Sequence, residues 1–199
     1  MRVTRGFGIL EQYLASLRVK KANQLVKGFQ FKEKLLDIGC GSYPLFIMNT
    51  DYRERYGLDG NVHDMSCLLE DETLVSLKRF NIAEEQALPF NDSTFDAVSM
   101  LAVLEHVYIN KASFLFSEIF RVLKPGGSYI LTTPAPWTGG LLTLMAYMRL
   151  ISPDECDDHK DLYGHDQIRT LMVSAGFNKD NIRCGYFECF MNLWAVARK

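Results

Sequence analysis

Residues 35–42 read Leu-Leu-Asp-Ile-Gly-Cys-Gly-Ser, and this stretch decides the fold. Its first four residues have the length and apolar character of a buried strand, and Gly39 and Gly41 then form a Gly-x-Gly turn. Pro44 follows at a position suited to the start of a helix. A glycine turn between a strand and a helix lets the backbone approach a ligand at the carboxyl edge of a parallel sheet. We therefore expect a ligand site at this turn.

Strand-length apolar runs recur on both sides of the turn and alternate with segments of helical periodicity. The clearest helix is 111–123, where Phe114, Leu115, Ile119, Val122 and Leu123 share one face. Further helices are predicted within 7–27 and at 166–175. Alternating strands and helices indicate a parallel sheet with right-handed crossovers. The predicted strands are 35–38, 55–58, 78–82, 95–101 and 128–133.

Two β-rich runs close the chain, at 181–187 and 190–197. The two or three residues between them permit an antiparallel hairpin and exclude a parallel crossover. We interpret residues 1–199 as a single domain. It divides into an N-terminal helical segment (1–33), a cofactor-binding core (34–133), a substrate-side insertion (134–163) and a C-terminal helix with a β-hairpin (164–199).

The composition agrees with one globular domain, since 48% of the 199 residues are hydrophobic and 23% are charged. The net charge of −2 argues against nucleic acid as a partner, because a phosphate-binding surface needs an excess of Lys and Arg. The five cysteines are odd in number and form no C-x-x-C motif, so we expect reduced thiols in the cytoplasm and no metal site.

The sequence also argues against export and against a transmembrane segment. Glu11 and Arg18 interrupt any apolar region of a signal peptide. The longest uncharged stretch, 125–148, holds three prolines and four glycines, which a simple membrane-spanning helix would not carry.

Two acidic residues and one proline distinguish this turn from one that binds a dinucleotide. Asp37 precedes the turn, and Pro44 stands where a third glycine would be. A carboxylate there repels a pyrophosphate but attracts an ammonium or sulfonium group. Asp59 lies 22 residues after Asp37, at the end of the next strand, where it can accept hydrogen bonds from both ribose hydroxyls. The expected ligand is a positively charged adenosine derivative.

These residues, with three later blocks, resemble the class I S-adenosylmethionine-dependent methyltransferases, in particular the type 11-like subgroup that methylates small molecules. The resemblance covers residues 30–199. Five blocks carry it in order: Leu-Asp-Ile-Gly-Cys-Gly (36–41), Gly-Leu-Asp (57–59), Ala-Leu-Pro-Phe-Asn-Asp-Ser-Thr-Phe-Asp-Ala-Val (87–98), Leu-Glu-His-Val (104–107) and Glu-Ile-Phe-Arg-Val-Leu-Lys-Pro-Gly-Gly (118–127).

The resemblance implies an α/β fold: a Rossmann-like, doubly wound seven-stranded sheet, mostly parallel with an antiparallel last strand and helices on both faces. It implies S-adenosylmethionine as cofactor. Many relatives have an acid where this chain has Asn81, whose carbonyl would accept less strongly from the adenine amino group. The implied cofactor-binding residues are Asp37, Gly39, Cys40 and Gly41 on the methionine and ribose side, Asp59 at the ribose, Asn81, Ile82 and Ala83 at the adenine, and Leu101 beside the methionine.

Two histidines are candidates for a general base, which a hydroxyl acceptor would need. His106 follows the fourth strand, and His159 matches a histidine that relatives carry before the last helix. Either histidine could instead have a structural role. His106, together with Glu105, could brace the next helix. Some related ubiquinone-pathway enzymes carry a metal-binding Glu-x-x-Glu-His here, but Ala102 replaces the first glutamate. No metal is therefore expected.

The insertion at 134–163 is rich in apolar residues, including Trp137, and would either pack on the N-terminal helix or cover a hydrophobic or glycolipid acceptor. Basic residues before the first strand form either a solvated face or a peripheral membrane contact. We favour methyl transfer to a small-molecule, sugar or lipid-linked acceptor, at oxygen. A non-catalytic S-adenosylmethionine-binding module and a nicotinamide-dependent reductase are the alternatives. The Asn/Asp-Pro-Pro-aromatic run of amide methyltransferases is missing after the fourth strand, where 101–104 reads Leu-Ala-Val-Leu.

Overall fold

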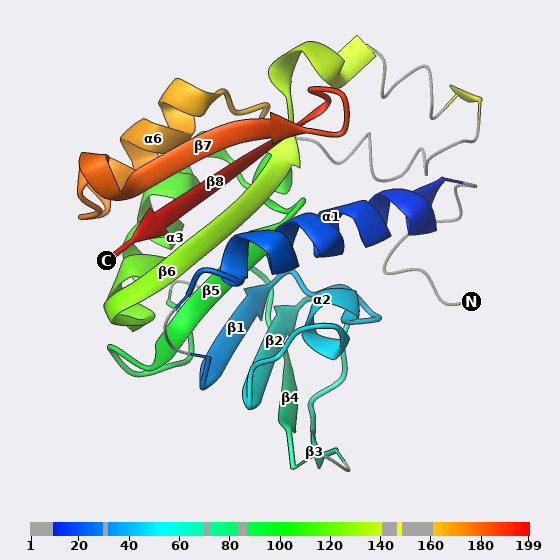
Figure 1. The fold of residues 1–199 in the computed structure, drawn as a ribbon, viewed down its shortest axis with the longest axis vertical. Coiled ribbons are helices and arrows are strands. Elements are labelled where there is room, and N and C mark those ends of the chain that lie inside the picture. Colours follow the sequence, from blue (N-terminus) through cyan, green and yellow to red (C-terminus); the bar gives the residue numbers. More distant parts are fainter. Residues whose placement is uncertain (1–9, 30–31, 70–71, 83–86, 141–146, 149–160) are drawn as a thin grey trace.

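A computed structural model describes the chain except for residues 1–9, 30–31, 70–71, 83–86, 141–146 and 149–160, and shows a sheet with helices on both faces (Figure 1). The sheet has eight strands in the order β3-β4-β2-β1-β5-β6-β8-β7. The strands are β1 (Lys34–Ile38), β2 (Glu54–Asp59), β3 (Met65–Leu68), β4 (Leu74–Arg79), β5 (Phe95–Leu101), β6 (Leu123–Pro134), β7 (Ile182–Phe187) and β8 (Asn192–Arg198).

The central strands β4, β2, β1, β5 and β6 run parallel, so their carboxyl ends meet at one edge of the sheet. At one side β3 pairs antiparallel with β4. At the other side β8 pairs antiparallel with both β6 and β7. The predicted Rossmann-like fold with an antiparallel last strand is therefore confirmed, and β3 is an eighth strand that the sequence did not indicate.

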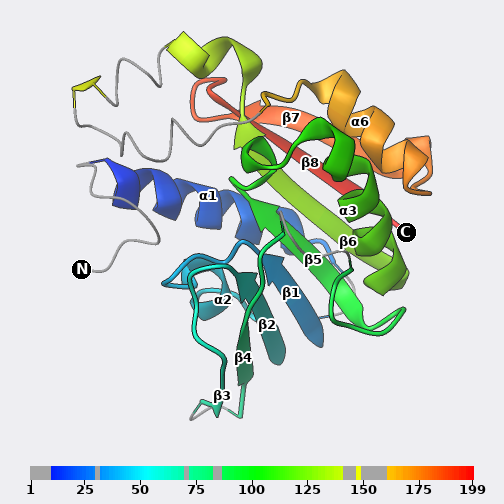
Figure 2. The ribbon, with the colours of Figure 1, turned by 180° about the vertical axis from the view of Figure 1, so that it is seen from behind.

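Helices α1 (Glu11–Val26) and α2 (Leu45–Met48) cover one face of the sheet, and α3 (Ile109–Val122) and α6 (His165–Ser174) cover the other, as seen from behind in Figure 2. Alternate side chains of β1 pack against the helices on the two faces of the sheet. Leu35 packs in a cluster with Ala22 and Val26 of α1, whereas Leu36 packs in the larger cluster that includes Phe116 of α3. Short 3-10 turns lie at η1 (Leu104–His106), η2 (Pro136–Thr138) and η3 (Lys179–Asn181).

Three details differ from the sequence prediction. Strand β3 escaped prediction because almost all of its residues are exposed, so it has no apolar alternation. Strand β4 begins at Leu74, four residues before the strand predicted at 78–82. The start was missed because a polar residue, Ser76, interrupts the apolar run of β4. Phe114 was predicted on the buried face of the helix but is half-exposed, and Phe116 is buried there instead.

The predicted division into segments with boundaries at 33, 133 and 163 remains a prediction. Much of the predicted insertion lies outside the described residues, and of its apolar side chains Trp137, Tyr147 and Met148 are described and exposed. Within the part of the chain that the structure describes, no helix is long and apolar enough to cross a membrane.

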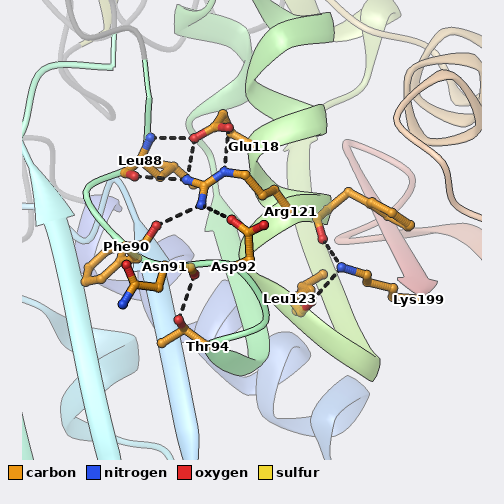
Figure 3. A network of polar contacts seen from close by, with 10 residues as sticks. Leu88, Phe90, Asn91, Asp92, Thr94, Glu118, Arg121, Leu123 and Lys199 are labelled. Atoms are coloured by element: carbon orange, nitrogen blue, oxygen red, sulfur yellow. Dashed lines mark hydrogen bonds and ion pairs between the residues drawn. The ribbon is translucent and has the colours of Figure 1, made fainter.

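A polar network fastens the loop before β5 to α3, and Arg121 is its centre (Figure 3). The guanidinium of Arg121 donates to both carboxylate oxygens of Glu118 at 2.8 and 2.7 Å and to Asp92 at 2.7 Å. It also donates to the carbonyls of Leu88 and Phe90 at 3.1 and 2.8 Å. Hydrogen bonds from Arg121 hold the pKa of Glu118 below its usual range. A planar fork of donors therefore holds the loop in place.

Arg121→Lys should lower the free energy of unfolding by about 2–3 kcal/mol, because one ammonium group replaces few of these hydrogen bonds and leaves loop carbonyls without a donor. Urea denaturation would measure the change. Arg169→Lys, at an exposed site on α6, is the matched control and should stay within about 0.5 kcal/mol of the wild type. Equal losses in the two variants would contradict the proposed role of the network.

Candidate functional site

The Gly-x-Gly turn follows β1 at the carboxyl edge and is tied to the neighbouring strand β2. The backbone N–H groups of Gly39 and Cys40 both donate to the carbonyl of Leu58, at 2.7 and 3.1 Å. Gly39 and Gly41 each have φ of +74°, in the left-handed region that disfavours other residues. The turn is thus held in one conformation by the sheet itself.

Gly39 is also required by close packing. A Cβ atom added to it would lie 2.3 Å from Cγ2 of Val103, in the segment that follows β5. The backbone after β1 and the segment after β5 are therefore in direct contact. This contact places both segments around the same space at the edge of the sheet.

Gly39→Ala should lower the free energy of unfolding by about 2–4 kcal/mol, through the positive φ and through the clash with Val103. Adding Val103→Ala should restore part of this loss, because it removes the clash but leaves the backbone strain. Gly28→Ala, where no atom lies within 4 Å of an added Cβ, serves as the control in urea denaturation. A failure of Val103→Ala to restore any stability would show that the close contact is not the cause.

Asp37 lies at the same edge and is 3% exposed. Its Oδ1 accepts a hydrogen bond from Ser99 Oγ of β5 at 2.7 Å. Burial raises the pKa of Asp37 to about 7; the Ser99 hydrogen bond opposes this rise, and the charge of Asp59 adds to it. The carboxyl group is therefore partly protonated near neutral pH, and a cation placed beside it would favour its ionised form.

Asp37→Asn should raise the melting temperature of the free protein at pH 8 but not at pH 5. The folded state binds this proton more tightly than the unfolded chain, so the stability of the wild type falls as pH rises from 3.8 to about 7. An amide carries no charge and avoids that loss. Differential scanning fluorimetry at the two pH values measures the difference.

Asp51→Asn is the control for this comparison, since Asp51 is 84% exposed, and its effect should be small at both pH values. A destabilisation by Asp37→Asn of the same size at pH 5 and pH 8 would contradict the raised pKa.

Asp59 ends β2 and is 1% exposed. Its Oδ2 accepts from the backbone N–H of Gly41 at 3.0 Å, and its Oδ1 accepts from that of Asn61 at 2.8 Å. Both carboxylate oxygens therefore stabilise the backbone of the neighbouring loops.

Two adjoining cavities surround the turn and share Gly39, Val103 and His106. The structure brings Asp37, Gly39, Cys40, Gly41, Leu101 and His106 to the first cavity. It brings Gly39, Asp59, Asn81, Ile82 and His106 to the second. The predicted residues Ala83 and His159 lie outside the described residues. The roles predicted for all of these residues remain predictions.

The contribution of α1 to the first cavity was not predicted from the sequence. Ala15, Arg18 and Val19 line the first cavity together with Asp37. The basic residues of this helix suggested a solvated face or a membrane contact, whereas Arg18 is half-buried at the cavity. No motif in the sequence signals this placement, because it depends on where α1 crosses the sheet.

Glu105 and His106 both belong to η1, which follows β5, but their side chains have different surroundings. Glu105 is buried and accepts from Thr133 Oγ1 at 2.9 Å, so it braces β6. His106 is half-buried and lines both cavities. Among the described residues, no group of three or more His, Cys, Asp or Glu side chains is arranged to hold a metal ion.

Comparisons with known proteins agree with this geometry. Residues 36–131 match a family model described as a methyltransferase domain. A "Probable S-adenosylmethionine-dependent methyltransferase" of Mycolicibacterium smegmatis is 34% identical over 101 residues, 50% of this chain and 37% of the relative. A "Fatty-acid O-methyltransferase" of the same organism is 32% identical over 107 residues, 52% of this chain and 38% of the relative.

Among solved structures, a SAM-dependent methyltransferase from Archaeoglobus fulgidus superimposes with a TM-score of 0.66 at 14% identity, covering 92% of this chain and 94% of that one. Residues 36–131 are a methyltransferase domain similar to that of class I S-adenosylmethionine-dependent methyltransferases, and this similarity implies S-adenosylmethionine as cofactor. The chain spans only 30% to 51% of the length of three curated relatives that it matches.

Proposed function

We propose that this protein transfers the methyl group of S-adenosylmethionine to an oxygen atom of a small-molecule, sugar or lipid-linked acceptor. The observation that carries the proposal is the joint placement of Asp37 and Arg18 around the Gly-x-Gly turn. A carboxylate and a guanidinium in one cavity complement the ammonium and carboxylate groups of a methionine moiety. A pyrophosphate would instead meet the carboxylate of Asp37.

Arg18 is the residue that we assign to the methionine carboxylate. Within the described part of the chain it forms no ion pair and no hydrogen bond through its side chain. A half-buried guanidinium without such a partner is available for a bidentate contact with a carboxylate. Asp59 in the adjoining cavity would hold the ribose, with Asn81 and Ile82 beside the adenine.

When bound, S-adenosylmethionine supplies an electrophilic sulfonium methyl group, so the chain needs no nucleophilic side chain of its own. Its residues would align the acceptor and exclude water, and positioning of this kind contributes up to about 7–11 kcal/mol. His106 lines both cavities, and we propose that it takes the proton from an acceptor hydroxyl. His159 stays a second candidate for this base.

The names of similar proteins include O-, C- and N-methyltransferases: a fatty-acid O-methyltransferase, a ubiquinone/menaquinone biosynthesis C-methyltransferase and a phosphoethanolamine N-methyltransferase. Oxygen is our choice because a histidine beside the cofactor site suits the removal of a hydroxyl proton. We retain peripheral contact with an anionic membrane as part of the proposal, supported by exposed Lys20 and Lys27 on and just after α1. A cytoplasmic location likewise stays a proposal.

Calorimetric titration with S-adenosylhomocysteine tests the cofactor site. Arg18→Met should weaken binding by roughly tenfold to a hundredfold, the range expected for losing a hydrogen-bonded charge pair. Lys20→Met, which removes an exposed cation from the same helix, should change the dissociation constant by less than about twofold. Equal affinity in Arg18→Met and the wild type would remove Arg18 from the site.

The same titration separates the proposed function from its alternatives. If the wild type does not bind S-adenosylhomocysteine but binds NADH saturably, the protein is a nicotinamide-dependent reductase and the proposed function is wrong. Tight cofactor binding without transfer of a radiolabelled methyl group to any fraction of a cell extract would favour a binding module. Transferred label that alkali does not release as methanol, but that hot hydriodic acid releases as methyl iodide under conditions that leave N-methyl groups intact, supports methylation of a hydroxyl oxygen. A methyl ester is saponified by alkali, and a C-methyl group resists both reagents.

A further inference from the structure

Glu188 lies in the turn between β7 and β8 and has a buried carboxylate oxygen. Since Asn192 pairs with Pro134 at the end of β6, this turn lies at the carboxyl edge of the sheet, as the Gly-x-Gly turn does. Glu188 Oε2 accepts a hydrogen bond from Asn192 Nδ2. Its Oε1 is buried, and no group in the described part of the chain donates to it. A buried acceptor without a donor is costly, so a nearby cation would stabilise Glu188.

The backbone of this turn is strained, and the segment after β6 holds it in place. Residues 188–190 have φ of 50°, 52° and 66°, in the left-handed region. Most side chains are uncommon there, and such strain persists only where the surroundings hold it. Trp137 Nε1 donates to the carbonyl of Phe190 at 3.1 Å. The N–H of Ala135 donates to the carbonyl of Met191 at 2.8 Å, so the turn is fixed from outside the hairpin.

Helix α1 brings a cation to this turn. Lys21 Nζ of α1 lies 4.8 Å from the centroid of the Trp194 ring of β8. Arg18 precedes Lys21 by three residues and projects from the same face of α1. Asn192 precedes Trp194 by two residues and projects from the same face of β8. The two elements therefore bring Arg18 close to Asn192 and Glu188, and the positive charge of Arg18 accordingly opposes the rise that burial causes in the pKa of Glu188.

Two carboxylates compete for the Arg18 guanidinium. One is Glu188, and the other is Asp37, which lines the first cavity together with Arg18. Within the described residues Arg18 forms no ion pair with either of them, so its charge is available to a ligand. An ion pair between Arg18 and Asp37 would occupy the two groups that the proposed function assigns to the methionine moiety. The attraction of Glu188 for Arg18 disfavours that ion pair.

We infer that Glu188 is a positioning residue, whose carboxylate keeps the Arg18 guanidinium separate from Asp37 and ready for the carboxylate of the methionine moiety. Among the described residues that line the two cavities Glu188 is absent, so it acts on the ligand through Arg18. Fixing a long side chain before binding reduces the entropy that is lost when the ligand binds. This inference rests on the proposed function and adds a residue of the C-terminal hairpin to the same site.

The test compares two ligands by calorimetry: S-adenosylhomocysteine, and 5′-methylthioadenosine, which has the same adenosine and sulfur atom but no amino acid group. Glu188→Gln removes the charge that attracts Arg18 and keeps the shape of the side chain. It should weaken binding of S-adenosylhomocysteine by about tenfold, because the guanidinium is then free to pair with Asp37. Binding of 5′-methylthioadenosine should change by less than about twofold, since this ligand does not use Arg18.

The same substitution in an Arg18→Met background tests whether Glu188 acts through Arg18. Without the guanidinium, the charge of Glu188 can only repel the carboxylate of the ligand. Adding Glu188→Gln to Arg18→Met should therefore leave the affinity for S-adenosylhomocysteine unchanged or raise it, whereas the same change lowers this affinity in the wild type.

Glu72→Gln is the matched control, because Glu72 is an exposed glutamate before β4, and it should bind both ligands as the wild type does. Three results would overturn the role of Glu188: unchanged affinity for S-adenosylhomocysteine in Glu188→Gln, equal weakening of both ligands, or the same loss with and without Arg18. Failure of the wild type to bind S-adenosylhomocysteine would instead contradict the proposed function. Thermal melts of each variant show whether it is folded.

Discussion

The close approach of three backbone segments at one edge of the sheet is the constraint on which the rest of the structure depends. The turn after β1 is hydrogen-bonded to the end of β2 through the Leu58 carbonyl and packs directly on Val103 after β5. Only a residue without a side chain fits at Gly39, and its φ also excludes most others. This contact brings the ends of three strands together, so Asp37, Asp59 and Leu101 at those ends line the two cavities.

Electrostatics then decide what these cavities can hold. Asp37 and Asp59 are both nearly inaccessible to water, and their mutual repulsion contributes to the raised pKa of Asp37. Two buried carboxylates near each other disfavour an anionic ligand and favour one with positive charge. Arg18 adds a cation to the lining of the first cavity. The ammonium and carboxylate groups of a methionine moiety pair with both the carboxylates and the guanidinium, whereas a diphosphate pairs with the guanidinium alone.

Much of the fold could be predicted because the central strands are buried on both faces. Strand β5 was predicted with its observed bounds, since all but the last of its residues are buried and five of its seven residues are apolar. Strand β3 left no such signal, because exposed positions carry no periodic constraint. Phe114 fits the apolar spacing of α3, yet half of its side chain is exposed, because helical periodicity alone does not define the edge of the buried face.

By itself the sequence determined the local part of the candidate site. Asp37, the Gly-x-Gly turn and Asp59 follow strands whose ends must share an edge, so their proximity follows from parallel pairing. Tertiary structure alone decided that Arg18 lines the first cavity and that Glu188 lies on the same edge with a buried, unpartnered oxygen in the described structure. Residue spacing encodes neighbours along one element, whereas these two contributions depend on how α1 crosses the sheet and how β8 pairs with β6.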